Sequence, residues 1–157
     1  MGGRHGFGRH DHDACVADAM AAAERACAAR GLRLTPVRRR VLELLSAEHA
    51  ALGAYDVMAR LGRDGFGSTP PVAYRALSFL VEAGFAHRIE RLNAFVACAL
   101  PGAAHDPAFL ICRACGAVAE TPTDAPLGAT AEAAGFAIEQ VVVEAEGLCP
   151  DCRAPAS

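Results

Sequence analysis

The chain contains no apolar run that approaches the ~18 residues of a membrane-spanning helix. Its first ten residues are polar and rich in glycine, unlike the apolar segment of a signal peptide. These absences predict a soluble, cytoplasmic protein without a membrane partner. The 157 residues suffice for one domain or two small ones, and the 53% hydrophobic content is enough to bury a core.

Familiar signatures of catalysis are missing as well. The sequence has no phosphate-binding glycine loop, no Gly-x-Ser-x-Gly nucleophile turn and no His-Glu-x-x-His helix of a zinc hydrolase. We therefore expect that the protein is not an enzyme and has no small organic substrate. One enzymatic alternative stays open, thiol–disulfide exchange, because the chain contains two Cys-x-x-Cys pairs.

Lysine is absent, so all 15 basic residues are arginine. The net charge of −3 would by itself argue against binding to nucleic acid. The charge is unevenly distributed, however. Residues 1–100 carry 13 Arg and 10 acidic residues, whereas residues 101–157 carry 2 Arg and 8 acidic residues. This asymmetry predicts two modules, of which only the first faces phosphate.

Seven cysteines are present, an odd number that cannot pair completely within one chain. In the cytoplasm, cysteines bind metals more often than they form disulfides. A redox dithiol usually lies at a helix N-terminus in a βαβ unit, and neither Cys-x-x-Cys pair has that setting. Two such pairs can instead surround a tetrahedral Zn²⁺, which predicts a closed structural zinc site. Its ligands would be Cys112, Cys115, Cys149 and Cys152.

The first hundred residues have the pattern of a winged helix-turn-helix domain over residues 11–100, preceded by a disordered tail over residues 1–10. Capping residues, proline at helix starts, glycine at helix ends and helical apolar spacing predict the helices. A winged helix inserts its last helix into the major groove of DNA. The expected helices cover residues 11–30, 36–47, 54–61 and 70 to the glycine at 84, followed by hairpin strands at 86–90 and 94–98.

A Leu-Pro-Gly sequence at residues 100–102 breaks this pattern and marks the expected domain boundary. Residues 101–157 predict a small α+β unit, with strands at 109–111, 116–120 and 136–144 and a helix at 124–134. A unit of this size can bury little apolar surface, and a bound zinc ion commonly stabilises such small domains.

A second set of candidate metal ligands lies on both sides of the boundary, with His87 and Cys98 before it and His105 and Glu120 after it. Such a set can be tetrahedral, and its thiolate favours zinc over iron or manganese. Asp106 stays open as the alternative carboxylate. A metal that needs both halves would restrain the orientation of the two modules. A looser N-terminal group could bind metal but is more simply explained as a tail without that role: His5, His10, His12 and Cys15.

Five short motifs occur along the chain. Leu-Arg-Leu-Thr-Pro-x-Arg begins at residue 32, Ala-Tyr-Asp at 54, Pro-Pro-x-x-Tyr-Arg-Ala-Leu-x-Phe-Leu at 70, Gly-Phe-x-His at 84 and Phe-x-x-Cys-x-x-Cys-Gly at 109. Over about residues 15–152 the sequence thereby resembles the ferric uptake regulator family of bacterial metal-sensing repressors. In its details, including Cys98 and the Gly-Leu-Cys at 147–149, it is most similar to the zinc uptake regulator branch.

The resemblance implies an α+β fold, with a winged helix followed by a small α/β dimerisation domain. It implies a homodimer that binds palindromic double-stranded operator DNA when metal-loaded and represses zinc uptake genes. His87, Cys98, His105 and Glu120 match the sensory ligands of the zinc branch, so each subunit would hold two zinc ions, one structural and one regulatory. A sensor of iron, manganese or peroxide with the same fold is the alternative.

Candidate DNA contacts come from the last helix and its neighbours. Arg75 is the best candidate for reading a base, because arginine to guanine is the commonest specific contact. Tyr74 could touch a thymine methyl group or phosphate, and Tyr55 matches a DNA-contacting tyrosine of the family. Arg38 and Arg39, with the arginine that follows them, would neutralise phosphates or form a solvated helix face.

Overall fold

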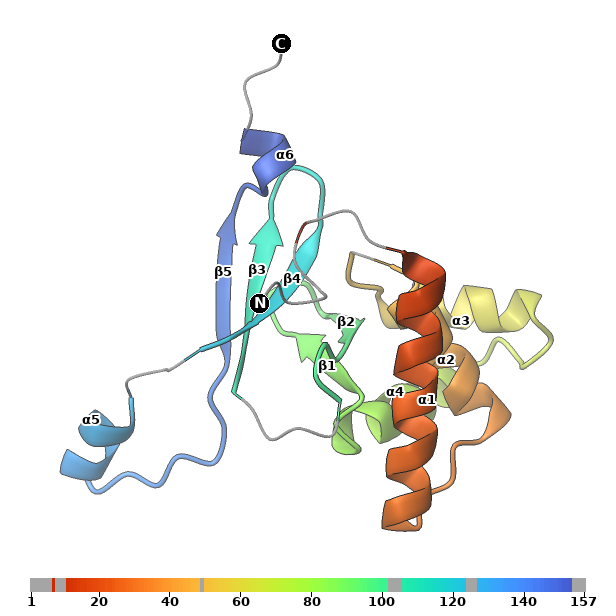
Figure 1. The fold of residues 1–157 in the computed structure, drawn as a ribbon, viewed down its shortest axis with the longest axis horizontal. Coiled ribbons are helices and arrows are strands. Elements are labelled where there is room, and N and C mark those ends of the chain that lie inside the picture. Colours follow the sequence, from red (N-terminus) through yellow and green to blue (C-terminus); the bar gives the residue numbers. More distant parts are fainter. Residues whose placement is uncertain (1–6, 8–10, 49, 102–105, 124–126, 154–157) are drawn as a thin grey trace.

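The computed structural model describes residue 7 and residues 11–48, 50–101, 106–123 and 127–153. Helices and a β-hairpin form the first half of the chain, and a three-stranded sheet with two short helices forms the second (Figure 1). His105 and almost all of the expected tail over residues 1–10 lie outside the described residues. Within the described part, no helix combines the length and the apolar character needed to cross a membrane.

The helices of the first half begin and end at residues with capping chemistry. Asp11 accepts hydrogen bonds from two backbone N–H groups in the first turn of α1, and Thr35 accepts one from Arg38 at the start of α2. Gly31 ends α1 with φ of 65°, a conformation that costs glycine little. Proline opens α2 and α4. The bounds are His12–Arg30 for α1, Pro36–Ser46 for α2, Ala54–Arg63 for α3 and Pro70–Glu82 for α4.

The four helices enclose the main hydrophobic core. Cys27 of α1 is 3% exposed within it, as expected for a packing residue. Most of the other core residues recur at helical spacing along these helices. Each helix therefore buries one face in the core and exposes the opposite face to solvent or to a partner. The largest fully buried side chains of this core are Val41, Leu42, Leu45, Val57, Leu61, Leu77, Leu80 and Phe85.

A two-stranded antiparallel hairpin follows α4. Its strands are β1 (Ala86–Ile89) and β2 (Ala94–Ala97), joined by a turn over residues 90–93. Asn93 adopts a positive φ of 46° in that turn, a conformation that asparagine tolerates better than most residues. An isolated bridge between Leu52 and Phe95 attaches the hairpin to the segment before α3. This is the wing expected from the sequence.

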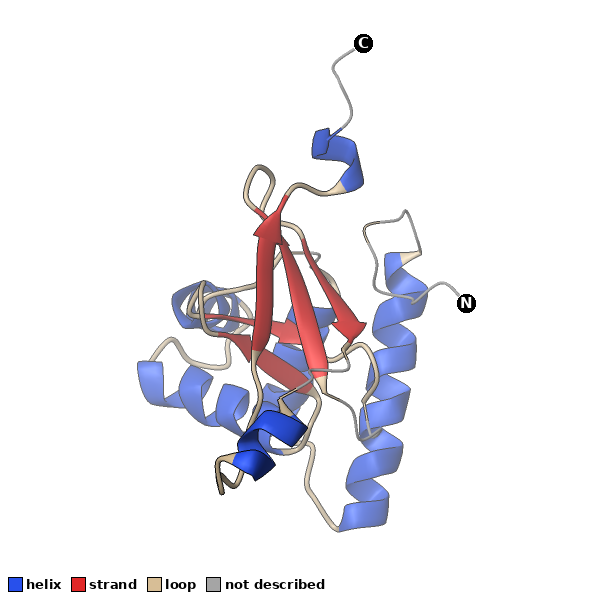
Figure 2. Ribbon diagram, turned by 90° about the vertical axis from the view of Figure 1, so that its left-hand side faces the viewer, coloured by secondary structure: helices blue, strands red, loops and turns tan. Residues whose placement is uncertain are grey.

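The second half is built on a sheet with the order β4-β3-β5. Strand β3 (Pro107–Cys112) pairs antiparallel with β4 (Val118–Pro122) and parallel with β5 (Val143–Gly147). Two short helices, α5 (Gly128–Ala133) and α6 (Pro150–Arg153), complete it. The strands of the hairpin run across those of this sheet (Figure 2). Ile89 of the hairpin packs with Phe109 and Ile111 of the sheet in a small second core.

One predicted strand is wrong. Residues 136–144 were expected to form it, but β5 begins only at Val143 and ends at Gly147. Phe136, Ile138 and Val142 are 67%, 39% and 48% exposed, and α5 with the stretch after it stands away from the body (Figure 1). Strand propensity is satisfied only where a neighbouring strand is available, and β3 offers its edge to residues 143–147. The helix expected over residues 124–134 is also shorter, and residues 124–126 lie outside the described part.

Candidate metal centres and nucleic-acid interface

The four cysteines of the two Cys-x-x-Cys pairs meet at one end of the sheet. Strands β3 and β5 are parallel, with Cys112 in register with Gly147, so both pairs follow the same ends of adjacent strands. Gly116 follows the first pair with φ of 77°, which favours glycine in so tight a turn. All four sulfur atoms lie within 4.8 Å of one another. The spacing predicted this cluster, and the parallel pairing explains how it forms.

The geometry and acidity of these thiols fit a tetrahedral metal site. A zinc–sulfur distance of ~2.3 Å places sulfurs about 3.8 Å apart, and Cys115 Sγ lies 3.8 Å from Cys149 Sγ. The backbone N–H of Cys149 donates to Cys112 Sγ at 3.3 Å. This bond, with help from the N–H of Cys115, lowers the pKa of Cys112 to about 6. The neighbouring thiols, Cys149 first, raise the pKa of Cys152 to about 12, as expected where negative charges would accumulate without a cation.

A second cluster lies where the hairpin meets the sheet. His87 of β1, Cys98 just after β2 and Glu120 of β4 bring their ligand atoms within 4.8 Å of one another. Glu120 Oε1 lies 3.3 Å from His87 Nε2 and 4.0 Å from Cys98 Sγ. Its other oxygen accepts the N–H of Ala99 at 2.7 Å. Three of the four predicted ligands are thus brought together, while His105 lies outside the described residues.

The thiol of Cys98 is the most deeply buried ligand of this cluster. Cys98 is 3% exposed, and burial, followed by the Glu120 carboxylate, raises its pKa to about 12. An imidazole, a thiol and a carboxylate from separate strands are a donor set suited to zinc. Asp106 is exposed and is not part of the cluster that the described residues form, so the geometry favours Glu120 as the carboxylate.

The candidate DNA contacts lie on the exposed face of the helices. Tyr74 and Arg75 project from α4 on the side opposite Ala76 and Leu77, which are 3% and 1% exposed. Tyr55, in the first turn of α3, is 71% exposed. Arg75 makes no hydrogen bond or ion pair with any other described residue. Its guanidinium is therefore available to a ligand.

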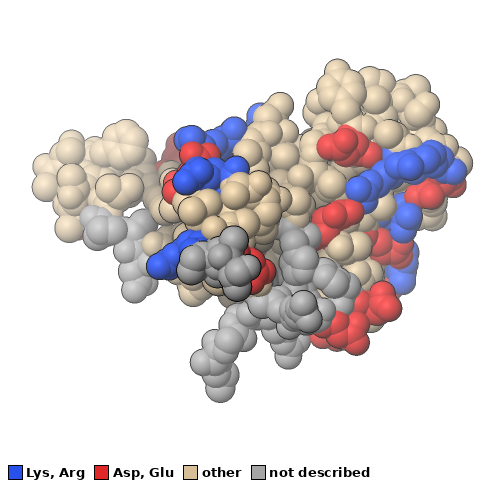
Figure 3. Space-filling view, turned by 90° about the horizontal axis from the view of Figure 1, so that it is seen from above, with Lys and Arg blue, Asp and Glu red and all other residues tan. Residues whose placement is uncertain are grey.

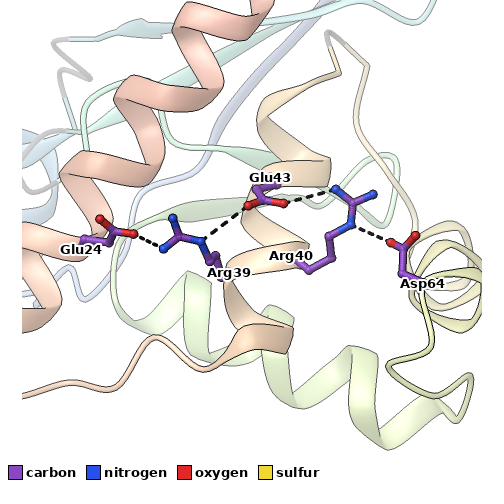
Figure 4. A network of polar contacts seen from close by, with 5 residues as sticks. All are labelled: Glu24, Arg39, Arg40, Glu43 and Asp64. Carbon is purple, nitrogen blue, oxygen red and sulfur yellow. Dashed lines mark hydrogen bonds and ion pairs between the residues drawn. The ribbon is translucent and has the colours of Figure 1, made fainter.

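Arg39 and Arg40 have partners within the protein. Arg39 of α2 pairs with Glu24 of α1 and with Glu43, one turn further along α2. Arg40 bonds Asp64, after α3, at 2.6 Å and Glu43 at 3.3 Å. Figure 4 shows these five side chains as one network that links the three helices. Figure 3 accordingly shows arginine and acidic side chains interspersed over the helices on the face in view.

Arg38 differs from Arg75, which has no polar partner among the described residues, and from Arg39 and Arg40, which pair with acidic side chains. Its guanidinium carbon lies 3.7 Å from the ring centroid of Phe79 in α4, and its Nη1 donates to the carbonyl of Arg33 at 2.7 Å. Such a cation–π contact attaches α2 to the helix that carries Tyr74 and Arg75. Sequence reasoning missed these internal partners because arginine runs on a helix face do not reveal which acids lie opposite them.

Comparison with known proteins gives one consistent set of relatives. The sequence model described as "Ferric uptake regulator family" matches residues 29–145. The "Zinc uptake regulation protein" of Escherichia coli (strain K12) is 42% identical over 137 residues, which cover 85% of this chain and 80% of the relative. These matches span both the helical half and the sheet.

The similar solved structures include both a holo form and an apo form of one protein, so the present structure can be compared with each. "Zinc Uptake Regulator Complexed With Zinc AND DNA" matches with a TM-score of 0.83 and 40% identity, covering 87% of this chain and 94% of that one. The holo form of XcZur matches with a TM-score of 0.78 and 41% identity, covering 85% and 95%. The apo form of XcZur has the same identity over 90% and 99% of the chains but a TM-score of only 0.52. The arrangement seen here is therefore much closer to the holo form than to the apo form.

Proposed function

This chain belongs to the ferric uptake regulator family, and we propose that within it the protein is a zinc-responsive repressor of transcription. It is a regulator that binds DNA and is not an enzyme. The observation that carries the proposal is the cluster of His87, Cys98 and Glu120, which joins the winged helix to the C-terminal sheet. The 42% identity to a zinc uptake regulation protein supports zinc as the sensed metal.

The two clusters are assigned different roles. The sulfurs of Cys112, Cys115, Cys149 and Cys152 provide all four positions of a tetrahedral site, so we assign them to a structural zinc. We assign His87, Cys98 and Glu120, with His105, to the regulatory zinc. A thiolate in the second set favours zinc over iron or manganese. When bound there, zinc supplies a crosslink between the two halves of the chain.

The regulatory ligands come from two modules, with the proposed boundary at residues 100–102. Ligands on both sides of a boundary favour the arrangement in which they meet, so an occupied site increases the population of that closed arrangement. The higher TM-score to the holo form than to the apo form of XcZur supports this reading. The protein acts on double-stranded operator DNA as a homodimer, and the likeness to a zinc uptake regulator solved with zinc and DNA supports this. In the closed form, two α4 helices would lie at half-site spacing. We place it in the cytoplasm.

Zinc-dependent binding to DNA tests this function directly. A gel shift on a candidate zinc-transporter promoter, titrated with Zn²⁺, Fe²⁺ and Mn²⁺, should show binding at the lowest concentration with Zn²⁺. A response to Fe²⁺ or Mn²⁺ alone would indicate one of the other sensors of the family. Rapid alkylation of the four cysteines near α6 without a chelator would instead favour thiol–disulfide exchange, because zinc-bound thiolates resist alkylation.

Arg75→Ala should weaken binding mainly at one base position of the operator. Loss of a bidentate arginine–guanine contact costs about 1–3 kcal/mol of discrimination. Arg39→Ala is the matched variant, because its guanidinium is bound to Glu24 and Glu43; it should leave base preference unchanged and at most lower the salt dependence. Affinities for operator and random DNA across a salt series measure both effects. Equal losses on the two DNAs for Arg75→Ala would count against base reading.

Zinc affinity at the regulatory site should rise with pH. The pKa of Cys98 is about 12 in the metal-free protein, so its thiol is protonated at neutral pH. Zinc binds the thiolate, and binding therefore releases this proton. Between about pH 7.5 and 9 the affinity should increase about tenfold per pH unit. Calorimetry in buffers of different ionisation enthalpy measures the released proton. A pH-independent affinity would exclude Cys98 as a ligand.

A further inference from the structure

The face of the C-terminal sheet that contacts the hairpin carries two aligned rows of side chains. Phe109 of β3 is in register with Glu120 of β4 on one side and with Glu144 of β5 on the other. Two residues further along β3, Ile111 is in register with Val118 and Glu146. Register partners, and residues two apart on one strand, point to the same face of a sheet. Both rows therefore face the hairpin.

Carboxylates lie at both edges of this face of the sheet, and they differ in what they contact. The centre is apolar, because Phe109 and Ile111 pack with Ile89 of the hairpin. The β4 edge holds Glu120, whose carboxylate lies 3.3 Å from His87 in the candidate regulatory site. The β5 edge holds Glu144 and Glu146, which the metal site does not include. The hairpin is thus attached at both edges of the sheet, and only one attachment involves metal ligands.

The attachment at the β5 edge is specific in its geometry. Glu144 accepts the backbone N–H of Glu90 at 2.6 Å and that of Arg91 at 3.0 Å, both in the hairpin turn. Glu146 accepts Nε and Nη2 of Arg91 at 3.0 and 3.1 Å, a bidentate pair. We call the contacts of Glu144 and Glu146 with the turn at Glu90 and Arg91 the β5 clasp. A single exposed ion pair contributes little, but the clasp combines a bidentate pair with two charge-assisted bonds to fixed backbone donors.

We propose that Glu144 and Glu146 are positioning residues that set the zinc concentration at which the protein closes. This inference rests on the proposed zinc-dependent switch. The clasp stabilises the closed arrangement without a metal, so it raises the fraction of metal-free protein that is already competent to bind zinc at the opposite edge. The apparent affinity for a ligand is proportional to that fraction. Thermodynamic linkage also requires the reverse effect, in which zinc at the β4 edge stabilises the clasp at the β5 edge.

Hydrogen exchange of the hairpin turn tests the clasp without DNA. In the wild-type protein, zinc at the regulatory site should slow exchange of the Glu90 and Arg91 amides. Glu144→Ala should speed their exchange about tenfold, because both amides lose a charge-assisted acceptor. Glu139→Gln is the matched control, since Glu139 is an exposed acid four residues before β5 and makes no hydrogen bond or ion pair with the hairpin turn among the described residues. Unchanged exchange in Glu144→Ala, or no effect of zinc on the wild-type turn, would overturn the proposal.

Charge reversal tests the effect on the zinc response. Arg91→Glu and Glu146→Arg should each raise, about three- to tenfold, the free zinc needed for half-maximal operator binding, and the double variant should return most of the way to wild type. Arg88→Gln is the control, because among the described residues Arg88 makes hydrogen bonds or ion pairs with Asn93 and Glu90 alone, and both lie in the hairpin. Retention of the structural zinc should be the same in all variants. Equal midpoints in all variants, or additive losses in the double variant, would refute the assignment. Wild type without any zinc response would refute the switch itself, while the exchange measurement would still report on the clasp.

Discussion

Cys98→Ala is expected to abolish the zinc response while leaving the structural zinc in place. Cys98 is 3% exposed and supplies the thiolate of the candidate regulatory site. Loss of even an outer-shell partner lowers metal affinity about 10–100-fold, so removal of a ligand itself should lower it by more than about 100-fold. Operator binding measured against buffered free zinc, with the zinc content per subunit, checks this result. The content should fall from two ions to one.

Cys27→Ala is the matched control for this variant. Cys27 is also 3% exposed, but it lies in the helical core and in neither candidate metal cluster of the described residues. The same chemical change there removes a packing contact and should leave the zinc midpoint where it was. Cys98→Ala with two bound zinc ions and an unchanged midpoint would remove this cysteine from the sensor.

The second large effect is expected for Cys149→Ala. Cys149 is 4% exposed, lies 3.8 Å from the sulfur of Cys115, and donates its N–H to Cys112. A structural zinc binds with an apparent free energy of roughly 10–16 kcal/mol, which is comparable to the roughly 5–15 kcal/mol net stability of a typical domain. The variant should therefore lose the zinc, the fold of the C-terminal sheet and the dimer together. Chelation of the wild-type protein should have the same outcome.

Thermal unfolding, sedimentation and metal analysis together measure that loss. Cys15→Ala is the appropriate control, because Cys15 is a half-buried cysteine of α1 that belongs to neither cluster. Its unfolding and dimerisation should match the wild type. A zinc-free Cys149→Ala protein that still dimerises and unfolds cooperatively would show that the four cysteines do not hold the domain together.

Local sequence signals predicted the helical half well. Thr35 caps the start of α2 and Gly31 caps the end of α1, where those helix ends were predicted, because capping depends on side chains and backbone groups a few residues apart. The α+β fold and the family were likewise predicted from motifs and are confirmed by the relatives. The Cys-x-x-Cys spacing predicted the four-sulfur cluster for a similar reason, since each pair is itself a local turn.

The errors and omissions concern contacts between distant segments. The strand expected at residues 136–144 appears at Val143–Gly147, where β3 provides a parallel partner. The sequence left open whether Arg39 faces phosphate or solvent, and it did not indicate the contact with Glu24, fifteen residues earlier in the chain. Arg91 and Glu146 are separated by 55 residues and had no signal in the sequence at all. Each of these contacts depends on which elements pack together, and a single sequence does not record that.

The sequence by itself predicted the two groups of candidate ligands, the capped helices and the likeness to a metal-sensing family. Residue type and short spacing carry that information, because thiolates, imidazoles and caps act through chemistry that is local. Only the tertiary structure decided that Glu120 and not Asp106 meets His87 and Cys98. Only it placed Glu120 and Glu144 on opposite edges of one row, so that candidate metal ligands contact one side of the hairpin and the β5 clasp contacts the other. The register of three strands produces that row, and register is set by the packing of the whole sheet.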